Sequence, residues 1–221
     1  PWASHMPQSV QWCVQVITQI SRRMELGLFK GALKAIALSA AFFLLLGCSP
    51  KLDWRTVQSP QERYTALFPG KPDKLQRQIP YQGQEFLQTL EAVKIDEDVY
   101  SISSIKLLAN QSALLKNLTE HLQSNLLERA KASGGSVEVL ETTYQLSNRQ
   151  RVPSKDYFIV LKSAGKISQV MRVRWITRVA PNGDIWIYQI STLHANGGFE
   201  DAKDFLSKEE YENFFSEFAP E

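Results

Sequence analysis

Histidine and cysteine are scarce in this sequence, which holds three histidines and two cysteines in 221 residues. We therefore expect neither a zinc centre built on these ligands nor a disulfide scaffold. The sequence also lacks the G-x-S-x-G element of serine hydrolases and the G-x-G-x-x-G and P-loop patterns that bind nucleotide phosphates. No catalytic constellation of these kinds, no metal and no cofactor is expected.

An excess of charge is lacking as well. The formal net charge is +2, and residues 1–47 carry four basic side chains against one acidic. From Cys48 onward the chain therefore has 21 basic and 22 acidic residues, a net charge of −1. Bulk binding to nucleic acid needs a concentration of positive charge, so we expect no nucleic-acid partner.

A hydrophobic run near the N-terminus is too short to cross a bilayer. It covers residues 35–47, is uncharged and mostly apolar, and follows Lys30 and Lys34. A bilayer span needs about 20 such residues, whereas a basic flank before about 7 to 15 apolar residues is typical of a secretory signal peptide. The run ends in LLGC at 45–48, which resembles the lipobox of bacterial lipoproteins; the alternative is a buried helix that ends in Gly-Cys by chance.

The resemblance implies how the chain is processed and where it resides. In bacterial lipoproteins the lipobox cysteine is diacylated and becomes the first residue of the mature chain, so Cys48 is the expected lipidation site and membrane lipid the expected partner. Acyl chains contribute about 0.8 kcal/mol per buried methylene, which makes several chains a lasting anchor. Ser49 stands where an aspartate commonly favours inner-membrane retention, so we expect the periplasmic face of the outer membrane.

The lipobox divides the chain into four expected segments. Met24 opens a signal peptide at 24–47, so residues 1–23 are interpreted as upstream or cloning-derived sequence, with Met6 as the alternative start. A lipidated polar tether follows at 48–60, and a single domain at 61–221. The mature chain then has one cysteine and forms no internal disulfide.

Strand and turn signals alternate beyond the tether and are interrupted by helical periodicity. Leucines spaced three and four residues apart predict a helix over 111–132 that ends at Ser133-Gly134-Gly135. After residue 198 we expect helices, with a capping box at 207–210. Strands are expected at 64–68, 75–81, 86–95, 99–107, 137–146, 156–162, 167–179 and 185–193. The first two of these, 64–68 and 75–81, are expected to pair with one another.

This order of elements predicts an α+β fold, an antiparallel β-sheet packed with a long central helix and C-terminal helices. The order, together with FPGKP at 68–72, resembles small bacterial lipoproteins with the α/β sandwich fold of the photosystem II extrinsic subunit PsbP, including the DcrB-like proteins. The resemblance covers residues 54–218. It implies a binding or assembly module and supplies no common catalytic set.

A hairpin is expected at Asn182-Gly183, because this dipeptide between two strands is a strong turn signal. Three arginines on the strand before this turn, Arg172, Arg174 and Arg178, then form a row about 20 Å long. Such a row suits an anionic partner such as lipid phosphates or an acidic protein. The alternatives are a solvated face with local ion pairs and internal pairing within a sandwich. With a two-residue turn, Trp175, Trp186 and Tyr188 share one face, and Arg172, Arg174 and Arg178 share the other.

Three other groups have a functional and a structural interpretation, and we favour the structural one for each. His194 with Glu200 and Asp201 suits a weak acid–base or metal site, but a histidine at a strand end is common. The acidic turn at 96–98 suits a divalent cation but lacks the features of a calcium loop. The aromatic face of the last helix (Tyr211, Phe214, Phe215, Phe218) suits a partner groove but is more often core, and His121 is expected to be a solvated helix histidine.

These observations predict a membrane-anchored, non-enzymatic binding or assembly module of the cell envelope, with an envelope protein as a further partner. A second hypothesis is an envelope hydrolase that uses His194 with nearby carboxylates. A third is a purely structural lipoprotein that stabilises a larger envelope complex. A deep pocket around His194 with converging carboxylates would favour the hydrolase.

Overall fold

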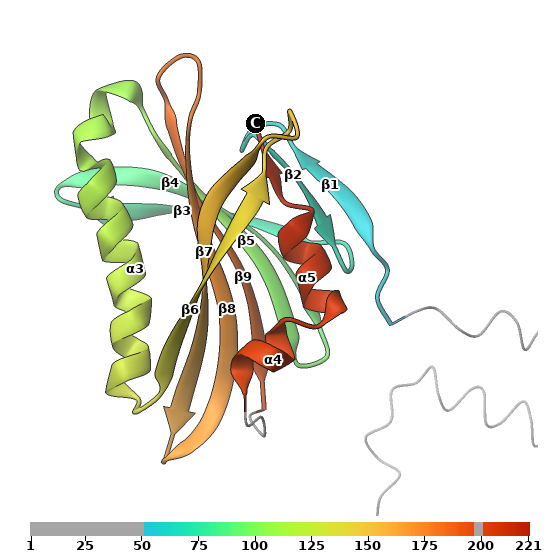
Figure 1. Cartoon of the computed structure of the whole chain (residues 1–221). Coiled ribbons are helices and arrows are strands. Elements are labelled where there is room, and N and C mark those ends of the chain that lie inside the picture. Colours follow the sequence, from blue (N-terminus) through green and yellow to red (C-terminus); the bar gives the residue numbers. More distant parts are fainter. Residues whose placement is uncertain (1–50, 197–200) are drawn as a thin grey trace, which may run out of the picture. The chain divides into compact units, whose positions relative to one another are not determined.

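The middle of the structure, a computed structural model that describes residues 51–196 and 201–221, is a seven-stranded antiparallel sheet. Its strands are β3 Asp73–Tyr81, β4 Gln84–Ile95, β5 Asp98–Leu107, β6 Ser136–Gln145, β7 Arg151–Ser163, β8 Lys166–Val179 and β9 Ile185–Ala195 (Figure 1). They lie in the order β3-β4-β5-β9-β8-β7-β6. The strand predictions for these regions are confirmed, although β7 begins at Arg151, because the part that contains Pro153 pairs with β6 and not with β8.

A second sheet consists of β1 Arg55–Ser59, β2 Tyr64–Phe68 and β10 Ala219–Pro220, in the order β1-β2-β10. The predicted pairing of β2 with β3 is therefore wrong. β1 reaches β2 through a short connection, which costs little loop-closure entropy. β1 also lies inside the segment 48–60 expected as a tether, and the amide of Asp53 donates to the carbonyl of Pro69 at 3.0 Å. The folded part thus begins before residue 61, within a compact unit formed by residues 50–221.

The helical segments lie close to their predicted positions. A 3-10 helix, η1 Ala109–Leu114, leads into α3 Leu115–Ala132, which ends before Gly134 at φ 74°. Near the C-terminus are α4 Ala202–Leu206 and α5 Glu209–Ser216. The predicted capping box at 207–210 is wrong, because Ser207 ends α4 as its C-cap and Lys208 is the N-cap of α5.

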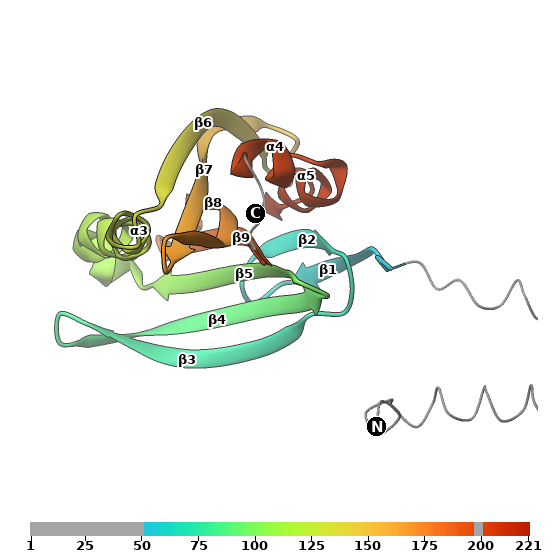
Figure 2. The ribbon, with the colours of Figure 1, turned by 90° about the horizontal axis from the view of Figure 1, so that it is seen from below.

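The helices cover opposite faces of the large sheet. Figure 2 shows α3 on one side and α4, α5 and the small sheet on the other. On the α5 side, Tyr211, Phe214, Phe215 and Phe218 are buried in the main hydrophobic cluster, so the structural interpretation of this aromatic face is confirmed. Two smaller clusters lie under α3, around Leu118 and Ala130. The fold is α+β with antiparallel sheets in layers, as predicted.

The Asn182-Gly183 hairpin between β8 and β9 has a three-residue turn, so the predicted two-residue turn is wrong. The amide of Gly183 donates to the carbonyl of Ala180 at 2.9 Å, and the amide of Ala180 donates to the carbonyl of Asp184 at 2.8 Å. Pro181 suits the second position of a type I turn, and Gly183 at φ 85° suits the left-handed position that follows. The strand pairing therefore moves by one residue, which reverses the face of every β9 side chain relative to β8.

The corrected register separates the tryptophans. Trp175 lies on the α3 side with its ring 5.1 Å from that of Tyr157. Trp186 and Tyr188 belong to the cluster on the α5 side. They share that face with the three arginines, because Arg178 pairs with Trp186 and Ile176 pairs with Tyr188.

A buried ionic cluster joins this face of the sheet to the C-terminal helices. Asp156 of β7 is fully buried, and Arg172 and Arg174 of β8 are 3% and 2% exposed. Both arginines donate to the Asp156 carboxylate, Arg172 through Nη2 at 2.6 Å and Arg174 through Nε at 2.6 Å. They also donate to backbone carbonyls, Arg172 to Leu206 at 3.2 Å and Arg174 to Phe215 at 3.1 Å. The cluster thereby fixes α4 and α5 on the sheet.

Replacing Asp156 with Asn is expected to destabilise the fold by about 3–5 kcal/mol, because two buried guanidinium groups would lose the carboxylate that they share and Arg174 would keep no paired carboxylate. Urea unfolding of the purified protein measures the loss. Glu212→Gln is the matched control, since Glu212 binds Arg172 at 2.7 Å but is 49% exposed, and its loss is expected to cost under about 1 kcal/mol. Equal losses in the two variants would contradict the assignment.

Candidate functional site

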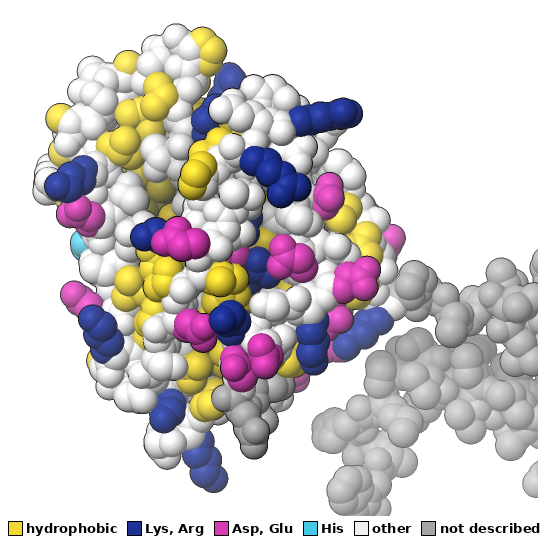
Figure 3. Space-filling model, in the orientation of Figure 1, with side chains coloured by type: hydrophobic (Ala, Val, Ile, Leu, Met, Phe, Trp, Pro, Cys, Tyr) yellow, Lys and Arg dark blue, Asp and Glu magenta, His cyan; other side chains and the backbone are white. Residues whose placement is uncertain are grey.

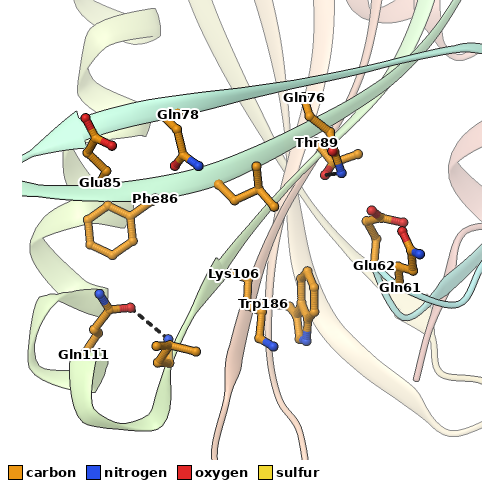
Figure 4. Close-up of a pocket in the computed structure, with 12 residues that line it drawn as sticks. Gln61, Glu62, Gln76, Gln78, Glu85, Phe86, Thr89, Lys106, Gln111 and Trp186 are labelled. Carbon is orange, nitrogen blue, oxygen red and sulfur yellow. Dashed lines mark hydrogen bonds between the residues drawn. The ribbon is translucent and has the colours of Figure 1, made fainter.

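A hollow of about 390 Å³ opens where the β1–β2 connection faces strands β3, β4, β5 and β9. Figure 4 shows its side chains arranged around one space. Its polar lining consists of Gln61, Glu62, Gln76, Gln78, Glu85, Thr89, Lys106 and Gln111, and its apolar lining of Phe86, Leu87, Leu108 and Trp186. A concave space of this size, part apolar and part polar, is suited to a small ligand.

Strand register brings the residues of the hollow together. Gln76 pairs with Thr89 across β3 and β4, and Lys106 pairs with Trp186 across β5 and β9. Because side chains alternate between the two faces of a sheet, residues paired in register lie on the same face. Three consecutive strands, β3 to β5, and the distant strand β9 therefore contribute side chains to one surface.

The β1–β2 connection forms a wall of the hollow and is held from below by a buried tyrosine. The hydroxyl of Tyr188 donates to the carbonyl of Glu62 at 2.6 Å and lies 3.1 Å from the carbonyl of Arg63. Tyr188 is fully buried beneath this connection. Gln61 and Glu62 are therefore held at fixed positions beside the sheet.

The charged side chains that line the hollow are largely compensated. Glu62 binds Lys74 at 2.8 Å. Lys106 binds Asp184 at 3.0 Å, and its Nζ lies 5.6 Å from the centre of the Trp186 ring. The third charged side chain of the lining, Glu85, has no ion-pair partner among the described residues, so the lining carries one uncompensated negative charge and no strong field.

The glutamine amides differ in how far other residues of the protein satisfy them. Gln111 accepts from the backbone amide of Leu108 at 2.9 Å, and Gln76 donates to a neighbouring hydroxyl at 3.3 Å. Within residues 51–196 and 201–221, the side-chain amides of Gln61 and Gln78 have no protein hydrogen-bond partner. Each of these amides can both donate to and accept from a ligand.

The three arginines expected to form a binding row do not lie together at the surface. Arg172 and Arg174 are buried against Asp156, which is the internal pairing given above as an alternative. Arg178 is partly buried, and its Nε is buried without a hydrogen-bond partner. Figure 3 shows positive and negative side chains interspersed over the face drawn.

The structure places His194 in a different network from the predicted one. Its Nδ1 lies 2.6 Å from a carboxylate oxygen of Asp98, which also accepts from the hydroxyl of Tyr211 at 2.9 Å. Asp201 instead caps α4, accepting from the amides of Lys203 and Asp204. Glu200 lies outside the described residues. Among the residues described, no cluster of three or more metal-ligating side chains occurs, and His121 is exposed on α3.

The expected signal peptide and the lipobox, which includes the expected lipidation site Cys48, also lie outside the described residues. In the described part, no helix combines the length and hydropathy needed to cross a membrane. No protein-family model matches the chain, and no curated protein matches it at a significant level.

Sequence reasoning did not find the hollow, because its residues carry no motif. Gln76 and Gln78 alternate along one strand, a pattern that indicates a polar face without indicating a site. The predicted two-residue turn places Trp186 with Trp175 and away from the arginine-bearing face. Pro181, directly before Asn182-Gly183, is the sequence signal that favours the longer turn, and the longer turn places Trp186 on the arginine-bearing face.

Four buried tyrosines belong to the hydrophobic cluster on the sheet face that carries the hollow. Burial raises the pKa of Tyr188 and of Tyr100. Burial, together with the Glu91 carboxylate that accepts from its hydroxyl, raises the pKa of Tyr64. Burial and the charge of Asp98 raise the pKa of Tyr211. All four hydroxyls therefore stay protonated in the folded state above the pH at which free tyrosine ionises.

Stability is expected to fall steeply above about pH 10. In that range the unfolded chain releases these protons and the folded chain keeps them, so each tyrosine lowers the free energy of unfolding by up to about 1.4 kcal/mol per pH unit. Urea unfolding between pH 8 and 12 measures the slope. Tyr188→Phe is expected to make the slope shallower by the contribution of one tyrosine. An unchanged slope would contradict the assignment of this pH dependence to the buried tyrosines.

Proposed function

We propose that this protein is a lipid-anchored, non-enzymatic binding module of the bacterial cell envelope and that the hollow is its binding site. The observation that carries the proposal is the hollow itself, a concave space with an aromatic side chain in its lining and with two amides, those of Gln61 and Gln78, that bind no other described residue. Small ligands bind in concave spaces with a few convergent polar groups. The lipobox at 45–48 supports lipidation of Cys48 on the periplasmic face of the outer membrane.

The PsbP-like sandwich is part of the same proposal. It is supported by the layered arrangement, in which one antiparallel sheet has α3 on one face and the C-terminal helices on the other. In the resemblance described above, such domains are binding or assembly modules, so an envelope protein is a further partner to test.

The short connection from Cys48 to the domain is consistent with binding close to the membrane. Asp53 follows Cys48 by five positions, a reach of about 18 Å when fully extended. The chain enters the small sheet at the start of β1, whereas Gln61 and Glu62 follow its other end. In a chain anchored at Cys48, the hollow would therefore lie at the end of β1 that is farther from the tether.

Binding is favoured over the hydrolase hypothesis by the state of the proposed catalytic groups. His194 is held by Asp98, and its ring lies 4.9 Å from that of Phe205. Asp201 is occupied as a helix cap. Neither residue lines the hollow, so the histidine and the candidate ligand site are separate.

Lipidation is tested by metabolic labelling with palmitate in a bacterial host. The wild-type chain is expected to incorporate label and to partition with membranes, and Cys48→Ala is expected to lose both, because the thiol is the atom that carries the acyl group. Cys13→Ala is the matched control and is expected to label normally. Equal labelling of wild type and Cys48→Ala would overturn the anchor.

Binding at the hollow is tested by a photo-crosslinking amino acid in place of Gln78, expressed in the native envelope. Gln78 is exposed and lines the hollow, so a crosslinked adduct is expected on irradiation. The matched control replaces Arg77, the neighbour whose side chain lies on the opposite face of β3.

The two positions distinguish a binding site from general proximity. An adduct at position 78 that is absent at position 77 supports the hollow. Equal adducts at both positions, or none at position 78, would contradict it and leave the structural lipoprotein as the better hypothesis.

A further inference from the structure

We infer that the ligand of the hollow is an uncharged oligosaccharide segment, such as the glycan of the cell wall or the sugar portion of a glycolipid. The inference rests on the proposed function, because it names the ligand class of that same site. It is carried by three features of the lining, namely its amides, its compensated charges and its aromatic side chain.

The amides match a ligand that carries many hydroxyl groups. A hydroxyl both donates and accepts, and a glutamine amide offers the complementary pair on one planar group. Gln61 and Gln78 face the hollow with no partner among the described residues, and Gln76 has a single long bond of 3.3 Å. They extend from two separate elements, the β1–β2 connection and β3, so they contact a ligand from two directions.

The charges of the lining disfavour an anionic ligand. Glu62 and Glu85 line the hollow with one cation, Lys106. Lys106 is bound to Asp184 at 3.0 Å, so it offers little free positive charge to a phosphate. A polyphosphate or nucleic-acid strand would meet the two carboxylates and gain no matching cluster of cations.

The aromatic side chain gives the hollow an apolar surface next to the amides. Trp186 lies beside Lys106 and in parallel with Tyr188, at 6.5 Å between ring centres and 9° between planes. Its indole is therefore held in one orientation and costs little conformational entropy when a ligand binds. Sugar rings present C–H groups as well as hydroxyls, so they suit a lining that is apolar on one side and hydrogen-bonding on the other.

A peptide strand fits the same place less well. Peptides commonly add to a free sheet edge, and β3 is the edge strand nearest the hollow. Lys74, Arg77 and Pro80 lie along β3, and Lys, other charged side chains and Pro are the devices that protect an edge from strand addition. An acyl chain is disfavoured by the amides and carboxylates, which would lose water without gaining hydrogen bonds.

The test is calorimetric titration of the protein with chitotriose and maltotriose as uncharged sugars and with trialanine as the peptide probe. At least one sugar is expected to bind, and Gln78→Leu and Gln61→Leu are each expected to weaken it about fivefold to tenfold, as for loss of one hydrogen bond. Arg77→Leu, on the opposite face of β3, is expected to leave the affinity unchanged. Both glutamines are exposed, so the variants are expected to fold, and unfolding by urea checks this.

The source of the sugar is separated by co-sedimentation of the protein with purified cell-wall sacculi and with lipopolysaccharide vesicles. Binding to either that is lost in Gln78→Leu supports the inference and identifies the source. Absence of sugar binding in a folded protein, trialanine binding in place of sugar, or equal weakening by Arg77→Leu would each overturn it. A specific crosslink at position 78 with no sugar binding would leave the proposed function standing and reject this ligand class.

Discussion

The structure depends on one buried carboxylate that binds two buried arginines. Asp156 is fully buried and binds both Arg172 and Arg174. The arginines also pack against the ring of Phe215, at 4.2 and 5.3 Å from its centre. A buried ion pair is a weak source of net stability, but it leaves few alternative arrangements, because any shift of α5 would expose a guanidinium group to an apolar surface. The cluster therefore specifies where the C-terminal helices lie.

The position of α5 in turn determines the hollow. The chain leaves α5 and enters β10, which pairs with β2 through Ala219 and Pro220. The amide of Glu221 then donates to the carbonyl of Arg63 at 3.0 Å, next to the wall formed by the β1–β2 connection. The ionic cluster and the candidate binding site are thus joined through the C-terminus, although they lie on different strands.

The sequence predicted what depends on local pattern and missed what depends on distant pairing. The two-residue periodicity indicated most strands, and the leucine spacing indicated the helix over 111–132. The pairing of β2 with β10 joins Tyr64 to Pro220, and no periodicity in either segment contains that information. The spacing of the three arginines predicts that they share a face, but the burial of Arg172 and Arg174 depends on Asp156, a residue that no motif distinguishes from the other acidic residues.

A hollow exists in this fold because the two sheets differ in size. β1 and β2 have five residues each, whereas β8 has fourteen and β4 has twelve. A sheet of short strands covers part of a face built from long ones and leaves the remainder open. The open part carries Gln76, Gln78 and Lys106, whereas the covered part near Tyr100 and Phe214 is aromatic and buried. The change from apolar to amide-rich side chains along one face thus coincides with the edge of the covering layer, which is how a single sheet face serves both as core and as a site for a ligand.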